Sequence, residues 1–143
     1  MVYARINLTL TNYQLYDNFK VLSGLEINTQ ELQGLYKTYC KYKRFKSVMP
    51  IFDDEFFDSK NDTIAYYDNG IMVAFSLVRR YNDKNAEAIQ FAWNYSNPKL
   101  ELGYASLRSE CALYKSLGFD YLYLGGADEY KHKFDGFEIL GPI

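Results

Sequence analysis

The sequence has few of the residues that build metal centres and disulfide frameworks. Its 143 residues include two cysteines, Cys40 and Cys111, and one histidine, His132. The cysteines fall on predicted helices without C-x-x-C spacing or clustered histidines, so we expect two buried free thiols and no metal site. His132 stands between two lysines that offer it no proton-relay partner, and we therefore expect an exposed histidine rather than a catalytic one.

Long apolar runs and a signal peptide are missing as well. No apolar stretch approaches the roughly 18 residues of a membrane-spanning helix, and residues 1–5 lack the apolar core of a signal peptide. We therefore expect a cytoplasmic protein with no membrane partner. The net charge of −2 argues against nucleic-acid binding by the molecule as a whole and leaves only local patches for such contacts.

Three catalytic signatures do not occur. There is no phosphate-cradling G-x-x-x-x-G-K-[ST] run, no H-E-x-x-H metal motif, and no Ser-His-Asp set that can be assembled around the lone histidine. A hydrolase or a nucleoside triphosphatase is therefore disfavoured. Repeats, low-complexity tracts and linkers are also missing, so we expect one domain over residues 1–143.

Aromatic residues are abundant, at 18% of the chain with 15 tyrosines and 10 phenylalanines. One interpretation is a tyrosine-rich sheet whose hydroxyl groups reach solvent or polar partners. The other is an aromatic-lined pocket or a base-stacking surface. Tyrosine abundance alone does not decide between them.

Local patterns predict a mixture of strands and helices. Residues 3–11 alternate between apolar and polar side chains, which is typical of a half-buried strand. Asn28 or Thr29 is suited to cap a helix whose apolar residues recur at helical spacing through Cys40. Asn69-Gly70 is a strong hairpin signal. The other predicted elements are a short helix from Asp53, strands at residues 63–68, 71–81, 86–95, 121–124 and 137–140, and a helix from Leu102 to the C-cap glycine Gly118.

A basic cluster follows the first predicted helix. Its members are Lys37, Lys41, Lys43, Arg44 and Lys46. Cations near a helix C-terminus interact favourably with the helix dipole, so a solvated helix face explains the cluster without any function. The alternative is a contact surface for the phosphate groups of a tRNA or of a nucleotide-bearing donor.

The order of the elements and several local motifs resemble the Gcn5-related N-acetyltransferase (GNAT) superfamily. The motifs are LELGYASLRSE at residues 100–110, LGFDYLYLG at 117–125, YKHKF at 130–134 followed by Gly141-Pro142, and LYKTY at 35–39. Within the superfamily the chain is most similar to the aminoacyl-tRNA–protein transferases, which include the arginyl and leucyl/phenylalanyl transferases. The resemblance implies an α/β (α+β) fold: a single GNAT-like domain with a mixed, mostly antiparallel sheet, splayed central strands and helices on both faces.

The resemblance also implies transfer of an acyl or aminoacyl group to a primary amine on a peptide or small molecule. The donor is then an acyl-CoA or an aminoacyl-tRNA. Acetyl-CoA enzymes of the superfamily have a polar residue where this chain has Leu100, although Gly103 and Ala105 fit their loop, and this favours an aminoacyl-tRNA donor. Two alternatives stay open: an acetyl-CoA-dependent N-acetyltransferase, and a non-catalytic binding module that retains the fold.

The predicted site lies where the central strands part. A glycine at the start of a helix lets a ligand approach the free N–H groups of the first turn. The resemblance implies donor contacts from Trp93, Asn94, Tyr95, Gly103, Tyr104, Ala105 and Ser106, and acceptor contacts from Gln90, Tyr123, Gly125 and Gly126. For catalysis it favours Glu87 as a base acting through water, Asp128 as a substrate-handling residue and Tyr130 as the proton donor to the leaving group. Each of these has a structural alternative: a solvent-facing Glu87, a plain sheet-surface Gln90, a capping Asp128 and an ordinary Tyr130.

Overall fold

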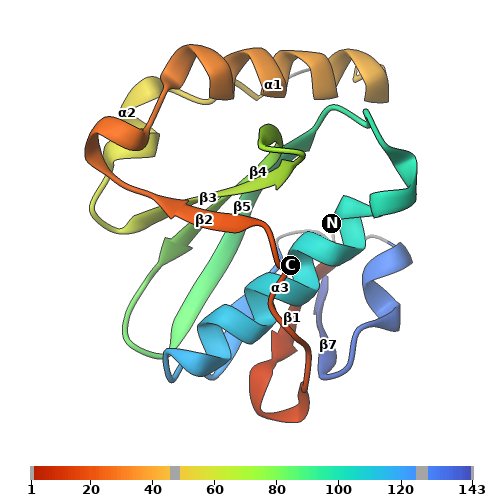
Figure 1. Cartoon of the computed structure of the whole chain (residues 1–143). Helices are drawn as coiled ribbons and strands as arrows, with labels where there is room; N and C mark the ends of the chain where they lie inside the picture. The colour runs from red at the N-terminus through yellow and green to blue at the C-terminus, as the bar shows by residue number, and fades with distance from the viewer. Residues whose placement is uncertain (1, 46–48, 125–128, 143) are drawn as a thin grey trace.

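A seven-stranded sheet lies between helices on its two faces (Figure 1). The structure, a computed structural model, describes residues 2–45, 49–124 and 129–142, and for residues 2, 129, 130 and 142 it describes the backbone only. The strands are β1 (Val2–Asn7), β2 (Phe19–Leu22), β3 (Asn61–Asp68), β4 (Ile71–Arg80), β5 (Asn85–Trp93), β6 (Tyr121–Tyr123) and β7 (Phe137–Pro142). The helices are α1 (Thr29–Lys43), α2 (Asp53–Phe57) and α3 (Leu102–Ser116), with 3-10 turns η1 (Leu8–Leu10), η2 (Gly24–Glu26), η3 (Pro98–Leu100) and η4 (Glu129–Lys133).

The strands are arranged in the order β2-β3-β4-β5-β6-β1-β7. Neighbouring strands are antiparallel except β5 and β6, which run parallel. A parallel pair needs a crossover connection between its strands, and α3 supplies it. The sheet is therefore mixed but mostly antiparallel, and β7, where the sequence predicted a strand, forms one of its edges.

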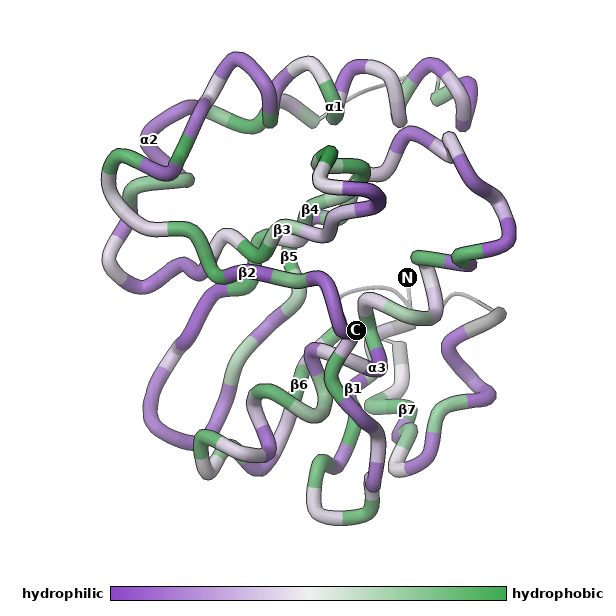
Figure 2. Tube along the Cα trace, viewed as in Figure 1, coloured by the Kyte–Doolittle hydropathy of each residue, from purple (hydrophilic) through white to green (hydrophobic). Residues whose placement is uncertain are grey.

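The predicted first helix is confirmed as α1. The Asn28 Oδ1 accepts a hydrogen bond of 3.1 Å from the backbone N–H of Glu31, which satisfies one free donor of the first turn. The buried residues recur at helical spacing and face the sheet: Leu32, Leu35, Tyr36 and Cys40. Figure 2 shows hydrophobic and hydrophilic residues alternating along this helix. The helix ends where Arg44 adopts a left-handed conformation with φ of 55°.

The hairpin predicted at Asn69-Gly70 joins β3 to β4. Both turn residues have positive φ, 51° for Asn69 and 78° for Gly70. Two-residue hairpin turns of this kind need positive φ at both central positions, and asparagine followed by glycine adopts it readily. The local sequence thus determines the turn that sets the β3–β4 register.

The first predicted strand is shorter than its alternating pattern suggested. β1 ends at Asn7, because the Asn7 Oδ1 accepts a hydrogen bond from the backbone N–H of Thr9 at 3.2 Å and caps the turn η1. Leu8 and Thr11 remain buried beyond the end of the strand. Leu10, which the alternating pattern places on the buried face, is exposed, so the predicted alternation ends where the strand gives way to η1.

Two apolar clusters fill the two faces of the sheet. The cluster on the α3 face includes Ile6, Tyr66, Leu107 and Tyr114, and the cluster on the α1 face includes Leu35, Phe56 and Phe75. Helices therefore cover both faces, as expected. Of the helices in the described part of the chain, none has the length and apolar character needed to cross a membrane.

Candidate functional site

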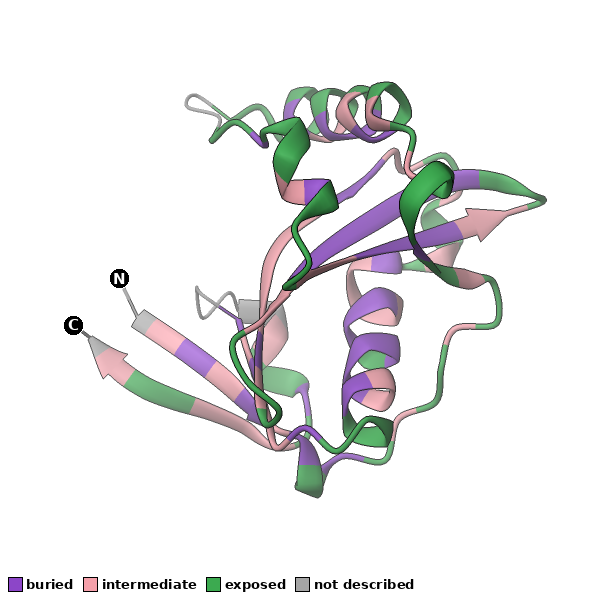
Figure 3. Cartoon of the chain, turned by 90° about the vertical axis from the view of Figure 1, so that its left-hand side faces the viewer, coloured by how far each residue is buried: buried purple, intermediate pink, exposed green. Residues whose placement is uncertain are grey.

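The parallel strands β5 and β6 are paired only over their first residues. The pairs are Asn85 with Tyr121, Ala86 with Leu122 and Glu87 with Tyr123. Beyond them the two strands follow different neighbours. The Leu124 N–H after β6 donates to the carbonyl of Ala4 in β1, while β5 stays paired with β4 as far as Trp93. Figure 3 shows the resulting divergence, with the two chain ends on one arm of the open sheet. The splayed central strands that the resemblance implied are present among the described residues.

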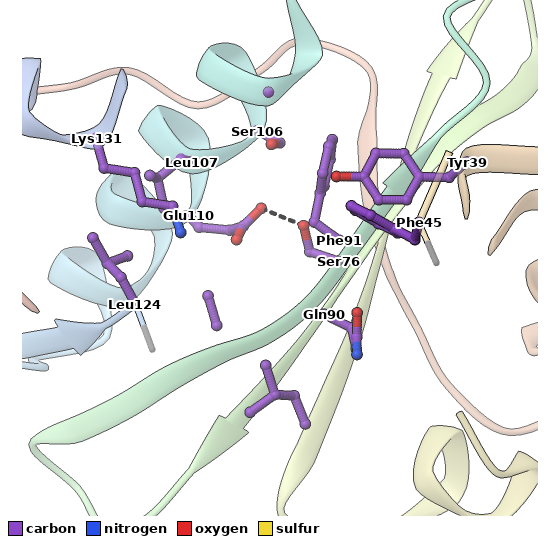
Figure 4. A pocket seen from close by; sticks show the side chains of 13 residues that line it. Tyr39, Phe45, Ser76, Gln90, Phe91, Ser106, Leu107, Glu110, Leu124 and Lys131 are labelled. Carbon is purple, nitrogen blue, oxygen red and sulfur yellow. Dashed lines mark hydrogen bonds between the residues drawn. The ribbon is translucent and has the colours of Figure 1, made fainter. Parts of the chain in front are cut away.

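A cavity of about 240 Å³ lies in the gap (Figure 4). β5 lines it with residues 88–91, and Leu124 lines it from the segment that follows β6. Its α3 side is formed by Gly103, Ser106, Leu107 and Glu110, and its α1 side by Tyr39 and Phe45. The cavity therefore connects the two faces of the sheet where the strands part.

Glu110 is the buried carboxyl group of this cavity. Tyr66 of β3 and Ser76 of β4 donate hydrogen bonds to its Oε2 at 2.5 Å and 2.7 Å. Burial raises the pKa of Glu110 to about 7, against the lowering effect of the two hydroxyl donors. A carboxyl group with this pKa can take up and release a proton near neutral pH, as a general acid or base must.

Three titratable groups near Glu110 in the core of the α3 face are held neutral by burial. Burial raises the pKa of the Tyr66 and Tyr114 hydroxyls and of the Cys111 thiol far above their usual values. A protonated, buried thiol is unreactive, so Cys111 acts as a packing residue. Among these neighbours on α3 and β3, the carboxyl of Glu110 is the group poised to titrate.

The start of α3 is open towards the same cavity. Glu101, before the helix, has a left-handed φ of 46°, and its carbonyl accepts the N–H groups of Tyr104 and Ala105 at 3.0 Å and 2.9 Å. Among the described residues, no acceptor is found for the N–H groups of Leu102 and Gly103. A Cβ added at Gly103 would meet no atom within 4 Å. The glycine therefore leaves space in front of N–H groups for which the described residues offer no acceptor.

Three of the predicted site residues line the cavity: Gln90, Gly103 and Ser106. Gln90 lies on the α1 side, beside the Tyr36 hydroxyl. Ser106 is buried on the α3 side, where its carbonyl accepts the Tyr66 hydroxyl at 3.2 Å. Tyr104 and Ala105 instead pack against the core on the α3 face, with Tyr104 stacked on Phe134.

Other predicted residues lie at the two ends of β5. Glu87 is in the paired region, outside the cavity lining, and its carboxylate accepts a hydrogen bond from the Tyr81 hydroxyl. Tyr123 is its partner on β6. At the far end, Trp93 is buried, Asn94 donates its N–H to the carbonyl of Val73, and the Tyr95 ring packs 4.2 Å from that of Trp93.

The remaining predicted residues are only partly described. Gly125, Gly126 and Asp128 lie outside the described residues, as does Lys46. Tyr130 belongs to η4, but its side chain is not described. Within the described residues there is no group of three or more histidine, cysteine, aspartate or glutamate side chains that could hold a metal ion.

The basic cluster borders the cavity. Lys37, Lys41, Lys43 and Arg44 are exposed, and none of them forms an ion pair with a described acidic residue. Three of them line a second cavity of about 540 Å³ together with Phe45, which lines both cavities. The Lys43 ammonium lies 5.9 Å from the centre of the Tyr95 ring. The positively charged surface of α1 therefore adjoins the α1 side of the cleft.

Sequence reasoning did not select Glu110 as a site residue. A signal was present, because Glu110 lies three residues after Leu107 and four before Tyr114 and so shares their face of α3. A carboxyl group on a buried helix face is expected to be paired or to have a shifted pKa. Its two hydroxyl partners come from β3 and β4, and no local pattern identifies them.

A mixed sheet that opens between two parallel strands, with helices on both faces and an open helix start at the gap, is the fold of the GNAT-like acyltransferases. The predicted fold class is thereby confirmed. No protein-family model matches the sequence, and no curated protein matches it either.

Solved structures with this fold are similar over most of the chain. One is the C-terminal domain of an Agrobacterium fabrum protein assigned as a lysylphosphatidylglycerol synthetase (TM-score 0.67, 15% identity, 88% of this chain and 46% of that one). Another is the Saccharomyces cerevisiae N-myristoyltransferase with bound myristoyl-CoA (TM-score 0.60, 11% identity, 98% and 47%). A third is a GCN5-related N-acetyltransferase from Kribbella flavida (TM-score 0.57, 12% identity, 96% and 52%). The chain thus spans about half the length of each, and these likenesses establish the fold.

Proposed function

We propose that this protein transfers an acyl or aminoacyl group to a primary amine within the cleft between β5 and β6. The observation that supports this most directly is the parting of the two strands after Glu87 and Tyr123. It leaves the backbone of residues 88–91 facing a cavity next to the open start of α3. A carbonyl-bearing donor can lie in such a gap like an added strand, with its oxygen polarised by backbone N–H groups.

The predicted residues take roles that follow from their places around the cleft. Gly103 and Ser106 contact the donor from α3, and Gln90 orients the acceptor from the α1 side. Residues 93–95 border the donor where β5 ends. Glu87, Asp128 and Tyr130 are retained as candidates for proton handling, with Glu87 acting through water because it lies outside the cavity lining.

An aminoacyl-tRNA is the donor that we favour. The exposed cations Lys37, Lys41, Lys43 and Arg44 adjoin the cleft through Phe45 and match the phosphates of an RNA backbone. Leu100 replaces the polar residue of acetyl-CoA-binding loops. The name of the Agrobacterium protein also refers to an aminoacylated product, since a lysyl group is an aminoacyl group.

An acyl-CoA donor is the second candidate, because one observation favours it. The N–H groups of Leu102 and Gly103 at the start of α3 have no acceptor among the described residues, and such donors suit a phosphate group. The yeast neighbour was solved with myristoyl-CoA. An N-acetyltransferase or another N-acyltransferase would use the same cleft.

Transfer assays with both donors test this proposal. The purified protein is incubated with a panel of primary amines and either a mixture of aminoacylated tRNAs or acetyl-CoA, and the modified amine is measured by mass spectrometry. We expect transfer from aminoacyl-tRNA. Saturable acetyl-CoA binding in calorimetry, with transfer from it, would reject the preference for tRNA.

A protein that binds a donor but transfers nothing would be a binding module that retains the fold. Alanine variants of Glu87, Asp128 and Tyr130 address this alternative. Loss of turnover in a folded variant rejects the binding module, because a module has no turnover to lose.

A further inference from the structure

We propose that Glu110 is the amine subsite of the cleft: its carboxylate binds the ammonium group of an aliphatic primary amine and takes a proton from it. This inference rests on the acyl-transfer function proposed above and names the acceptor that the cleft receives.

The cavity has the size and lining for such an acceptor. A volume of about 240 Å³ accommodates an alkylamine or the end of a lysine side chain. Phe91, Leu107 and Leu124 provide apolar contacts for a hydrocarbon chain, and Glu110 is the carboxyl group in the lining.

Glu110 is held in a fixed orientation towards this space. The hydroxyls of Tyr66 and Ser76 both donate to its Oε2, so the carboxylate is oriented before a ligand arrives. Figure 4 shows the side chain extending from α3 towards Ser76 at the wall of the cavity. A buried carboxylate in a fixed position attracts an ammonium group strongly, since little water screens the two charges.

Other titratable groups lie in or beside this space. Tyr39 from α1 and Lys131 from η4 line the cavity, while Tyr66, Cys111 and Tyr114 belong to the buried core on the α3 face. Burial raises the pKa of the Tyr66 and Tyr114 hydroxyls and of the Cys111 thiol, so these three groups carry no charge at neutral pH. A positive charge on Lys131 disfavours an ammonium ligand but favours the ionised form of Glu110, so its two effects on the proton transfer oppose each other.

The proton and electron movements balance in this scheme. One N–H bond of the ammonium breaks and an O–H bond forms on Glu110, which leaves a neutral amine and a neutral carboxyl group. The nitrogen lone pair then forms the C–N bond at the donor carbonyl, and the ester C–O or thioester C–S bond breaks. The leaving oxygen or sulfur departs with that electron pair and receives the second proton of the attacking nitrogen. Glu110 returns its proton to solvent.

Amine binding tests the subsite independently of transfer. The probe is n-butylamine hydrochloride, with n-butanol as the uncharged match, measured by calorimetry at pH 8. Wild type and the surface control Glu31→Gln are expected to bind the amine about 30-fold or more tightly than Glu110→Gln, because that change removes the buried charge partner. Equal binding by Glu110→Gln, or equal binding of butanol and butylamine by wild type, would overturn the proposal.

Wild type alone provides a second readout in case Glu110→Gln does not fold. A carboxyl group with a pKa of about 7 is mostly ionised at pH 8 and about 1% ionised at pH 5, so amine affinity should fall roughly 100-fold between these values. An affinity that does not change with pH would contradict the subsite.

The transfer assay separates this inference from the function itself. If wild type transfers and Glu110→Gln retains both rate and pH profile, Glu110 is not the proton acceptor although the function holds. If wild type transfers from neither donor but binds the amine through Glu110, the subsite holds and the proposed function fails.

Discussion

Glu110 illustrates how one residue connects the stability of this fold to its chemistry. Its carboxyl group is fully buried, and its two hydroxyl partners reduce the cost of ionisation without removing it. The folded protein therefore holds the Glu110 proton more strongly than the unfolded chain does. A binding site for a cation can use this property, because an arriving ammonium group supplies the missing partner.

The first prediction concerns stability as a function of pH. The pKa of Glu110 rises from its usual 4.5 to about 7 on folding, so the folded state binds more protons between these values. The free energy of unfolding should then fall by about 3 kcal/mol as the pH rises through this window, and stay level above it. Urea unfolding of wild type and Glu110→Gln at pH 5 to 8 measures the difference. Glu31→Gln should follow wild type, and parallel curves for Glu110→Gln and wild type would refute the shift.

The second prediction concerns Ser76. Its hydroxyl donates to the Glu110 Oε2 at 2.7 Å and favours the ionised form. Ser76→Ala should therefore raise the pKa of Glu110 further, which carboxyl ¹³C chemical shifts can follow in labelled protein. Ser116→Ala is the matched control, because that exposed hydroxyl donates to the Leu113 carbonyl instead. An unchanged Glu110 titration in Ser76→Ala would contradict the role of this hydrogen bond.

At the scale of the element, the two helical glycines of this chain make a matched pair. Gly34 in α1 and Gly103 in α3 would both accept a Cβ without contact within 4 Å. Only Gly103 lines the cleft cavity. Packing within the protein therefore accounts for neither glycine, and only Gly103 differs by its position beside the cleft.

The third prediction separates stability from function at these glycines. Alanine in a helix is favoured over glycine by about 0.5–1 kcal/mol, so Gly34→Ala and Gly103→Ala should both raise the midpoint of thermal unfolding. Gly103→Ala should also weaken donor binding, because its methyl group enters the cleft, and Gly34→Ala should not. Donor affinity from calorimetry decides the matter, and an unchanged affinity in Gly103→Ala would place the donor elsewhere.

The elements were largely predictable, because their signals are local. The cap at Asn28, the hairpin at Asn69-Gly70 and the glycine after α3 each fix a boundary through a few neighbouring residues. The site was less predictable. Glu110 contacts Tyr66 and Ser76 only after β3, β4 and α3 have packed together. These residues lie far apart in the sequence, so a local hydrophobic pattern cannot predict that they meet. The resemblance located the gap between the strands and selected Glu87 on β5 and residues 103–106 at the start of α3. It did not select Glu110, which lies one turn further along the same helix.

At the scale of the whole molecule, the charge distribution matters more than the net charge of −2. The described acidic residues that form ion pairs do so with Arg5, Lys20, Arg79 and Arg80. The exposed cations of α1 have no such partners among the described residues. A nearly neutral protein thus presents a positive surface on the side where the cleft opens past Phe45.

The last prediction tests whether this surface contacts donor phosphates. Each phosphate contact with a single strand contributes about 0.7 to the slope of log affinity against log salt. If each of these side chains makes such a contact, replacing Lys37, Lys41 and Arg44 together by glutamine should lower that slope by roughly two for aminoacyl-tRNA. The triple variant should unfold as wild type does, because these side chains are exposed on α1. Lys60→Gln, an exposed lysine before β3, should leave the slope unchanged. The same slope in the triple variant and wild type would mean that these cations form only a solvated helix face and interact with the helix dipole. The donor would then bind in the cleft without contacting them.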